Sequence, residues 1–570
     1  AVDEWGDLIL RMCNDCSHNG HTSAPNTGIH SWQHSAQKTT SVAQVAYKAI
    51  REEKKHPRSQ VRMAKDDVQK AFNLVATVLS MMGLFATCIG NLVLINLCLI
   101  FGSAASPGGF EVFGDVLVKA LMMTPRETAG VDTGELHPEV ARFCDDLLST
   151  MAMYGDRCED HLSRLRSLIV ALLGEHSLNV AKQGIEGTPE NCKHVFGAVA
   201  DCVDREICTP WSKVVKLAGL LGEFVNTPGG TFDYGVATQV RGVTFASMSF
   251  VPGVTRMLLP RLDVMAGDAA RTHPTLVTAP KGYVASPRLK GEKSDEEAWE
   301  RVRRVWNFVL RLALIDQGQL FRAKFEAVLP MSLRLTFPGK EPSSSFRQAV
   351  MDASGTKVFA VIINPAAGTI WYIREEFTEE ENECFNNFDA GREADCTTIN
   401  HREHVALDWL VTGPGVLHPG SIIDAAIDNT AAEAMTNSER YRTAKDEQVG
   451  ASVGMAELLF QQTVTASRVA SLANFADFFT RDKYDLDADG MLAHLEEKFG
   501  VKPQRWTLLP CKRNLGWLKL GPEESQQAWY TNQLEWFDWV QASHPEALSY
   551  CRVEPAKVRK ALEEGLAGTP

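Results

Sequence analysis

Residues 74–101 read LVATVLSMMGLFATCIGNLVLINLCLIF and carry no acidic or basic side chain. A helix that crosses a bilayer needs about 20 apolar residues, so this stretch is long enough to span a membrane. Asn91 and Asn96 interrupt it, and each amide would need a hydrogen-bond partner in lipid. We therefore expect one or two buried helices over residues 72–105. A single membrane-spanning helix is the alternative.

The regions outside this stretch indicate an α+β fold that is predominantly α-helical, a large irregular helical body with short β-hairpin or strand insertions. No fixed-period repeat and no regular alternation of strands and helices occurs. Changes in composition predict five regions: a polar N-terminal segment 1–50, a helical domain 51–225, a loop- and strand-rich insertion 226–290, a helix plus β-hairpin region 291–420, and a helical C-terminal region 421–570.

Two local predictions are the sharpest. Ser294, with Glu297 three residues later, forms a capping box, and Trp299 and Trp306 lie on one face of the helix that should follow. Residues 357–363 and 369–374 are rich in β-branched and aromatic side chains and predict a β-hairpin.

Composition limits the classes of protein that the chain could belong to. It has 570 residues, of which 45% are hydrophobic and 23% charged, which is typical of globular proteins. The net charge of −13 argues against non-specific nucleic-acid binding over the whole surface. The 13 cysteines are scattered and odd in number, and no Asn-x-Ser/Thr acceptor occurs. We therefore expect the cytoplasm or another reducing compartment, with a single-span membrane protein as the alternative.

One motif predicts a calcium site. Asp485-Leu486-Asp487-Ala488-Asp489-Gly490, with Glu at the twelfth position, resembles the EF-hand calcium loop. The resemblance implies side-chain ligands at positions 1, 3, 5 and 12, a backbone carbonyl at position 7, and a glycine for the sharp turn. The implied ligands are Asp485, Asp487, Asp489, Met491 and Glu496. The alternative is an Asp-rich turn that caps a helix.

A weaker motif has the spacing of a zinc site. Cys13 and Cys16 are followed by His30 and His34, with thirteen residues between the two pairs. Two thiolates and two imidazoles can share one tetrahedral ion. The intervening residues lack the aromatic, leucine and basic positions of a nucleic-acid-reading finger. A structural zinc is therefore the weaker hypothesis, and a polar segment ordered by packing is the stronger one.

The C-terminal region interleaves cations with aromatic rings, a composition that suits stacking on bases and contacts with phosphates. Local RNA contact would use Lys502, Arg505, Trp506, Arg513 and Trp517. The alternative is a basic loop over a hydrophobic core.

No catalytic constellation stands out in the sequence. We therefore interpret the chain as a non-enzymatic structural or assembly protein, a capsid-, nucleocapsid- or scaffold-like subunit that associates with itself or with other subunits. The alternative is a membrane-anchored, calcium-responsive accessory subunit of a larger complex, with residues 74–101 in the bilayer.

Overall fold

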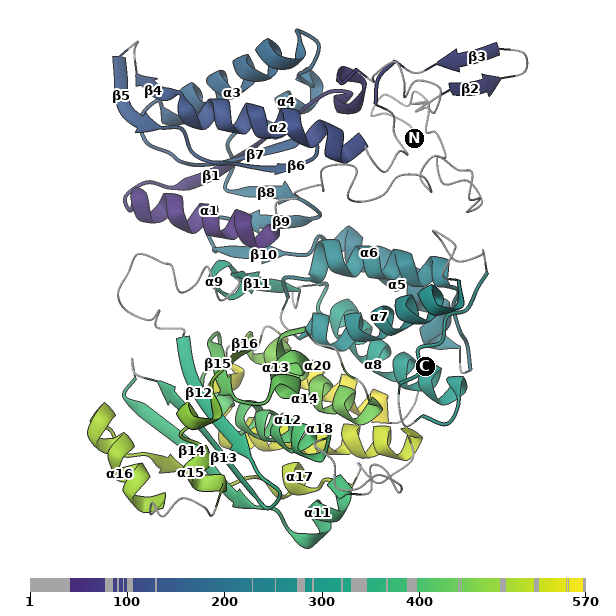
Figure 1. Cartoon of the computed structure of the whole chain (residues 1–570), viewed down its shortest axis with the longest axis vertical. Coiled ribbons are helices and arrows are strands. Elements are labelled where there is room, and N and C mark those ends of the chain that lie inside the picture. Colours follow the sequence, from purple (N-terminus) through teal and green to yellow (C-terminus); the bar gives the residue numbers. More distant parts are fainter. Residues whose placement is uncertain are drawn as a thin grey trace. The chain divides into compact units, whose positions relative to one another are not determined.

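The computed structural model of the chain divides into two compact units (Figure 1). Unit 1 comprises Ala1–Ile207 and His273–Pro280, and unit 2 comprises Cys208–Thr272 and Lys281–Pro570. The fold is α+β and predominantly helical, as the sequence predicts. The structure describes residues 41–570 apart from 77–85, 90, 91, 96, 100–105, 129, 130, 228, 252, 274–281, 290, 291, 319, 320, 330–345, 365, 366, 387–396, 439, 440, 442, 482–487, 517–521, 550, 552 and 567–570.

Unit 1 contains an antiparallel sheet with the order β1-β7-β6. Leu147 of the sheet packs with Leu117 and Leu165 of the covering helices in one hydrophobic core. The sheet and these helices are β1 (Val61–Asp67), β6 (Val140–Phe143), β7 (Asp146–Ala152), α2 (Ser106–Met123) and α3 (Arg157–Leu173). The other elements are α1 (Val42–Lys55), η4 (Ala71–Leu74), β2 (Ala86–Ile89), β3 (Leu92–Ile95), β4 (Pro125–Thr128), β5 (Val131–Leu136), α4 (Val180–Glu186), β8 (Cys192–Val195), β9 (Ala198–Asp201) and β10 (Glu206–Cys208).

Two described parts of the uncharged stretch are strands where we expected helix. Strands β2 and β3 pair antiparallel, with Ile89 opposite Leu92, so only Gly90 and Asn91 connect them. Gly-Asn between two short apolar runs is a hairpin signal, and it outweighs the length of the apolar run. The helices predicted within 72–105 are therefore wrong for residues 86–95. No helix in the described part of the chain has both the length and the hydropathy of a membrane-spanning helix.

Unit 2 begins with the helices α5 (Trp211–Asn226), α6 (Tyr234–Met248), α7 (Val254–Thr272) and α8 (Asp295–Ile315). Helix α8 confirms the predicted cap, because the Ser294 side chain accepts a hydrogen bond from the backbone N–H of Glu297 at 3.3 Å. The strands expected within 226–290 are wrong, since α6 and α7 fill much of this region. Val240, Val243 and Ser247 are buried at steps of three and four, which is helical spacing.

A six-stranded mixed sheet forms the other part of unit 2, in the order β16-β15-β12-β13-β14-β17. The predicted hairpin is confirmed as β13 and β14, which pair antiparallel. β12 pairs antiparallel with β13 and parallel with β15, and β16 is parallel to β15. The strands are β12 (Phe346–Ala353), β13 (Lys357–Asn364), β14 (Thr369–Glu376), β15 (Ile422–Ile427), β16 (Thr463–Arg468) and β17 (Gln504–Arg505).

Helices pack against this sheet. Helix α12 (Thr397–Thr412) packs on β12 and β13, and the short helix α15 (Asp477–Thr480) packs on the same two strands. Val350, Phe359 and Phe479 share one core cluster. The remaining elements are β11 (Arg322–Lys324), α9 (Phe325–Val328), α11 (Glu379–Asn386), η6 (Pro414–Leu417), α13 (Thr430–Ser438), α14 (Ala444–Phe460), η7 (Ser471–Ala473), α16 (Ala488–Phe499), α17 (Pro510–Arg513), α18 (Pro522–Ser543), α19 (Pro545–Leu548) and α20 (Pro555–Leu566).

A buried network of charges joins three helices of unit 2. The Nε atom of Arg301 on α8 donates to Glu292 at 2.5 Å, and its Nη1 atom donates to Glu447 on α14. Arg261 on α7 lies 3.3 Å from the same Glu447 carboxylate. The side chains of Arg261 and Arg301 are each 1% exposed, and that of Glu447 is fully buried. Each charge therefore depends on its partners, because water does not reach it.

Candidate metal centre

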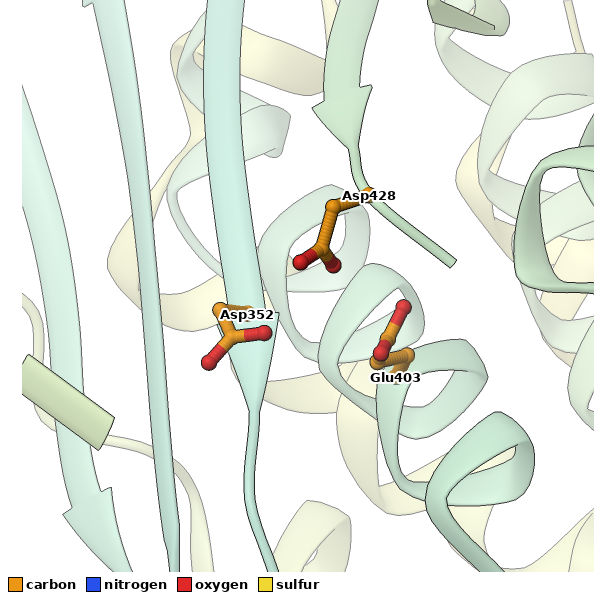
Figure 2. A group of neighbouring side chains, drawn as sticks. All are labelled: Asp352, Glu403 and Asp428. Atoms are coloured by element: carbon orange, nitrogen blue, oxygen red, sulfur yellow. The ribbon is translucent and has the colours of Figure 1, made fainter. Parts of the chain in front are cut away.

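Three carboxylates from different elements of unit 2 meet at one edge of the mixed sheet (Figure 2). Asp352 lies near the end of β12, and Asp428 directly follows β15. Because β12 and β15 are parallel, their carboxyl ends lie at the same edge. Glu403 comes from α12, which packs on β12. One oxygen from each of the three carboxylates lies within 4.8 Å of the other two.

The three carboxylates are largely removed from water and incompletely satisfied. Asp352 is 1% exposed and Glu403 is 3% exposed. The Oδ1 atom of Asp352 and the Oε2 atom of Glu403 are buried without a hydrogen-bond partner among the described residues. Buried acceptors normally have a donor or a cation beside them. A bound cation would therefore stabilise these converging carboxylates.

A fourth carboxylate and one arginine complete the surroundings. Asp477 begins α15, and its Oδ1 atom lies 3.1 Å from Nη2 of Arg481. The same Nη2 atom lies 3.6 Å from the Oδ2 atom of Asp428. The hydroxyl of Thr480 donates to Asp352. Four carboxylates therefore share one nearby arginine, so the ionised cluster carries an excess of negative charge.

Burial and mutual repulsion raise the pKa values of Glu403, Asp477 and Asp352. Burial raises the pKa of Glu403 to about 9, and the negative charges of Asp352 and Asp428 add to the effect. Burial also raises the pKa of Asp477 to about 6, and Asp352 adds to it. Burial is the main cause of the raised pKa of Asp352 as well. A divalent cation would reverse these shifts, because it favours the ionised carboxylates.

This electrostatic arrangement gives a testable dependence of stability on pH. A buried carboxyl whose pKa is raised stays protonated in the folded chain, whereas it ionises in the unfolded chain near its ordinary pKa of 4.5. We therefore expect the unfolding temperature in EDTA to fall by several degrees from pH 5 to pH 9, and Glu403→Gln to flatten this fall. Differential scanning fluorimetry measures both. An equal fall in Glu403→Gln would contradict this assignment.

Unit 1 contains a second group of carboxylates. Asp67 ends β1 and lies directly opposite Asp146, the first residue of β7. Asp145 precedes Asp146 in the tight connection from β6, where Cys144 has a φ of +55°. Burial raises the pKa of Asp145, and the charge of Asp67 adds to this effect. Antiparallel pairing thus brings three carboxylates from two distant parts of the sequence to one place.

Lysines neutralise two of the unit 1 carboxylates. Lys182 of α4 lies 2.6 Å from the Oδ1 atom of Asp67, and Lys65 lies 3.1 Å from the Oδ1 atom of Asp146. Asn179 donates to the Oδ2 atom of Asp67 at 2.9 Å. Both oxygens of Asp67 therefore already have partners, in contrast to the unsatisfied oxygens of Asp352 and Glu403.

The residues of the predicted calcium loop are not brought together by the described part of the chain. Asp485 and Asp487 lie outside the described residues. Asp489 is exposed near the start of α16, 3.9 Å from Arg374, and Glu496 is exposed on the same helix. Met491 packs against the core cluster of Val350 and Phe479. The calcium loop remains a prediction.

Some of the other predicted site residues also lie outside the described part of the chain, and the structure places the rest. Cys13, Cys16, His30 and His34 all lie outside the described residues, so the zinc site remains a prediction, and so does Trp517. Trp506 is buried against Trp371 and Trp539, where it cannot stack on a base.

The cations of the predicted RNA contact are placed near the acidic run after β14. Arg513 pairs with Glu375 and Glu381, and Arg505 also pairs with Glu375. Lys502 is exposed. Two of the three cations therefore serve ion pairs within unit 2.

Sequence reasoning missed the carboxylate cluster because its members are far apart in the sequence and match no local motif. The available signal was the place of each acid in its element. Asp352 and Asp428 each lie at the end of a β-rich run, and the paired acids Asp145-Asp146 separate two such runs in unit 1. Acids at strand ends meet when the strands are neighbours, which local spacing does not reveal.

Comparisons with known proteins give only distant likenesses. No protein-family model and no curated protein matches the sequence. A structure of a foamy viral protease-reverse transcriptase in complex with double-stranded DNA is 12% identical, with a TM-score of 0.34, over 82% of this chain and 64% of that chain. A second, in complex with an RNA/DNA hybrid, is 12% identical, with a TM-score of 0.33, over 82% of this chain and 50% of that one. The chain thus spans less than two thirds of the length of either structure.

The interpretation as a non-enzymatic capsid-, nucleocapsid- or scaffold-like protein is wrong. A structural subunit has no need of converging, unsatisfied carboxylates in its interior, and such clusters are typical of functional sites. The alternative of a membrane-anchored, calcium-responsive subunit with residues 74–101 as a spanning helix is wrong too, because residues 86–89 and 92–95 within that stretch pair as antiparallel strands.

Proposed function

We propose that the chain is a metal-dependent enzyme that cleaves phosphodiester bonds of nucleic acid. Its active site would be formed by Asp352, Glu403 and Asp428. The observation that carries the proposal is the convergence of these carboxylates with two buried oxygens that lack donors. Carboxylate oxygens are the ligands that Mg²⁺ and Mn²⁺ prefer. The residues predicted to bind calcium and zinc are not among these three.

The cluster has the chemistry of a two-metal phosphoryl-transfer site. Such metal ions stabilise the attacking and the leaving oxygens of an in-line displacement. Asp352 and Asp428 would hold cations from adjacent strand ends, and Glu403 would hold them from α12. Arg481 would limit the repulsion between Asp428 and Asp477 before a metal binds. Asp477, with its pKa near 6, is suited to exchange a proton near neutral pH.

The connectivity of the sheet supports nucleic acid as the substrate. Strands β12, β13 and β14 are consecutive and antiparallel, and β15 and β16 add in parallel on the other side of β12. This arrangement, with carboxylates on the inner strand β12, on α12 and directly after β15, resembles that of ribonuclease H-like nucleases. The support is an analogy of fold.

Cleavage of labelled nucleic acid tests the proposal. The full chain is incubated with end-labelled RNA/DNA heteroduplex, duplex DNA and single-stranded RNA in Mg²⁺, Mn²⁺ or EDTA. We expect cleavage of at least one substrate with metal, no cleavage in EDTA, and none by Asp428→Asn. The matched control is Asp424→Asn, which changes a β15 carboxylate held by Ser467 and Thr465 outside the cluster. Cleavage by Asp428→Asn at the wild-type rate would refute the assignment.

A second function, nucleotidyl transfer, is favoured by the carboxylates of unit 1. Asp67 and Asp146 face each other across two antiparallel strands, and Asp145 lies beside them. Polymerases also use paired metal ions held by carboxylates. Lys182 and Lys65, which now neutralise this group, would give way to metal and to substrate phosphates. A chain with both activities would resemble a reverse transcriptase in function.

Primer extension separates the two functions. With a primed template, nucleoside triphosphates and Mg²⁺, we expect extension by the wild-type chain and by Asp428→Asn, but not by Asp146→Asn. Cleavage should be lost in Asp428→Asn and kept in Asp146→Asn, because each carboxylate group lies within its own unit. Loss of both activities in either variant would argue against two independent sites. Absence of extension by the wild type would refute the second function alone.

A further inference from the structure

Unit 2 contains a cavity of about 320 Å³ between the mixed sheet and α16. Its inner wall is apolar and includes Val350 of β12, Ile363 of β13 and Leu495 of α16, all of which are buried. Phe475 and Phe499 add aromatic surface. Dry apolar cavities of about 150 Å³ already bind benzene-sized molecules, and ligand pockets begin at about 300 Å³. The cavity is therefore large enough for a small apolar ligand.

The described polar side chains of the cavity lie on its solvent side, and none of them is acidic. Lys498 and His494 lie one turn apart on α16, and both are exposed, as is Gln348 of β12. The Nζ atom of Lys498 lies 5.5 Å from the ring centroid of Phe499, so the cation lies near the apolar wall. No aspartate or glutamate is among the lining residues in the part of the chain that the structure describes. The mouth therefore complements a negative charge.

We infer that this cavity binds a small amphipathic anion, a ligand with an apolar ring system or chain and a single carboxylate, sulfonate or phosphate head. The apolar part fills the space against Val350, Ile363 and Leu495. The anionic head remains at the mouth beside Lys498 and His494, where it keeps contact with water. This arrangement gains from apolar burial without the cost of desolvating a charge. The inference concerns binding and does not depend on the proposed catalytic activity.

Fluorescence titration with 1-anilinonaphthalene-8-sulfonate tests the inference on the full chain. We expect saturable binding of one molecule per chain in the micromolar range. Ala473→Trp, which places a large ring at an exposed position of the cavity wall, should abolish this binding. Lys498→Glu should weaken it about fivefold or more, because the charge at the mouth is reversed. The matched control is Lys560→Glu, the same change at an exposed lysine of α20, which should leave binding unchanged.

The uncharged analogue N-phenyl-1-naphthylamine separates the two parts of the inference. It should bind about fivefold more weakly than the sulfonate to the wild type, and equally to wild type and Lys498→Glu. Circular dichroism and the unfolding midpoint verify that each variant is folded. If Ala473→Trp does not fold, Lys498→Glu still tests the inference, because it changes only a surface side chain. Absence of saturable binding, unchanged binding by both variants, or equal binding of the neutral analogue would overturn the inference.

Discussion

Asp352→Asn is expected to lower the rate of metal-dependent cleavage by more than about a hundredfold. Residues that only orient a metal ligand typically account for 10- to 100-fold, and Asp352 is placed to bind the metal directly. The asparagine keeps the size of the side chain but loses the negative charge that would attract the cation. The measurement is the initial rate of cleavage at saturating Mg²⁺, compared with the wild type.

The same variant should be more stable than the wild type without metal. Asp352 is buried beside Asp428 and Asp477, and repulsion among them adds to the cost of burying ionised carboxylates. We expect a higher unfolding temperature in EDTA and a smaller increase on addition of Mg²⁺. Asp538→Asn, which changes an exposed aspartate on α18, is the control that should change neither property. A variant that keeps more than a tenth of the wild-type rate would exclude Asp352 as a ligand.

Arg301→Met is expected to destabilise unit 2 by about 3–5 kcal/mol, which is the usual cost of breaking a buried ion pair from one side. The substitution leaves Glu292 without its arginine partner and leaves Glu447 with Arg261 alone. A loss of this size is a large share of the roughly 5–15 kcal/mol by which most domains are stable. Urea unfolding followed by tryptophan fluorescence reports the change, since Trp299 and Trp306 lie on the same helix.

An exposed pair provides the comparison for this network. Arg241 lies 2.9 Å from Asp263, but the two side chains are 52% and 40% exposed. Arg241→Met should therefore cost no more than about 1 kcal/mol, because water already screens both charges. If Arg301→Met and Arg241→Met had similar effects, burial would not be the reason that the Arg301 network stabilises the fold.

Sequence reasoning succeeded where one local pattern determines one element. The cap at Ser294 and the apolar face with Trp299 and Trp306 predicted helix α8, and the β-branched runs predicted the hairpin of β13 and β14. In both cases the residues that specify the element are neighbours in the sequence. Tertiary context did not have to decide between alternatives.

The predictions were wrong where the same residues are compatible with both a helix and a strand. Residues 86–89 and 92–95 are apolar enough for a buried helix, yet they pair as antiparallel strands. In α6 the β-branched residues Val240, Val243 and Thr244 suggest strands, but their burial follows the helical repeat. Periodicity outweighed intrinsic propensity in that helix.

The candidate metal centre could not be predicted from a local motif, because its residues come together only in the folded sheet. Glu403 belongs to an ordinary helical segment, and Asp352 and Asp428 follow unremarkable apolar runs. Only the order of the strands places them together, because β12 and β15 are neighbours although β13, β14 and α12 separate them in the chain. The local pattern predicts neither β12 nor β15 as a strand, since residues 421–570 are expected to be helical, so it also misses the strand ends that carry Asp352 and Asp428.

The position of β12 between β13 and β15 determines which mutations the centre can tolerate. Insertion or deletion of a single residue within β12 would shift its pairing on both sides and turn Asp352 towards the opposite face of the sheet. The connection between β13 and β14 lies outside this pairing, so its length can vary without moving a ligand. Insertions and deletions tolerated during evolution should therefore accumulate in that connection and be absent from β12.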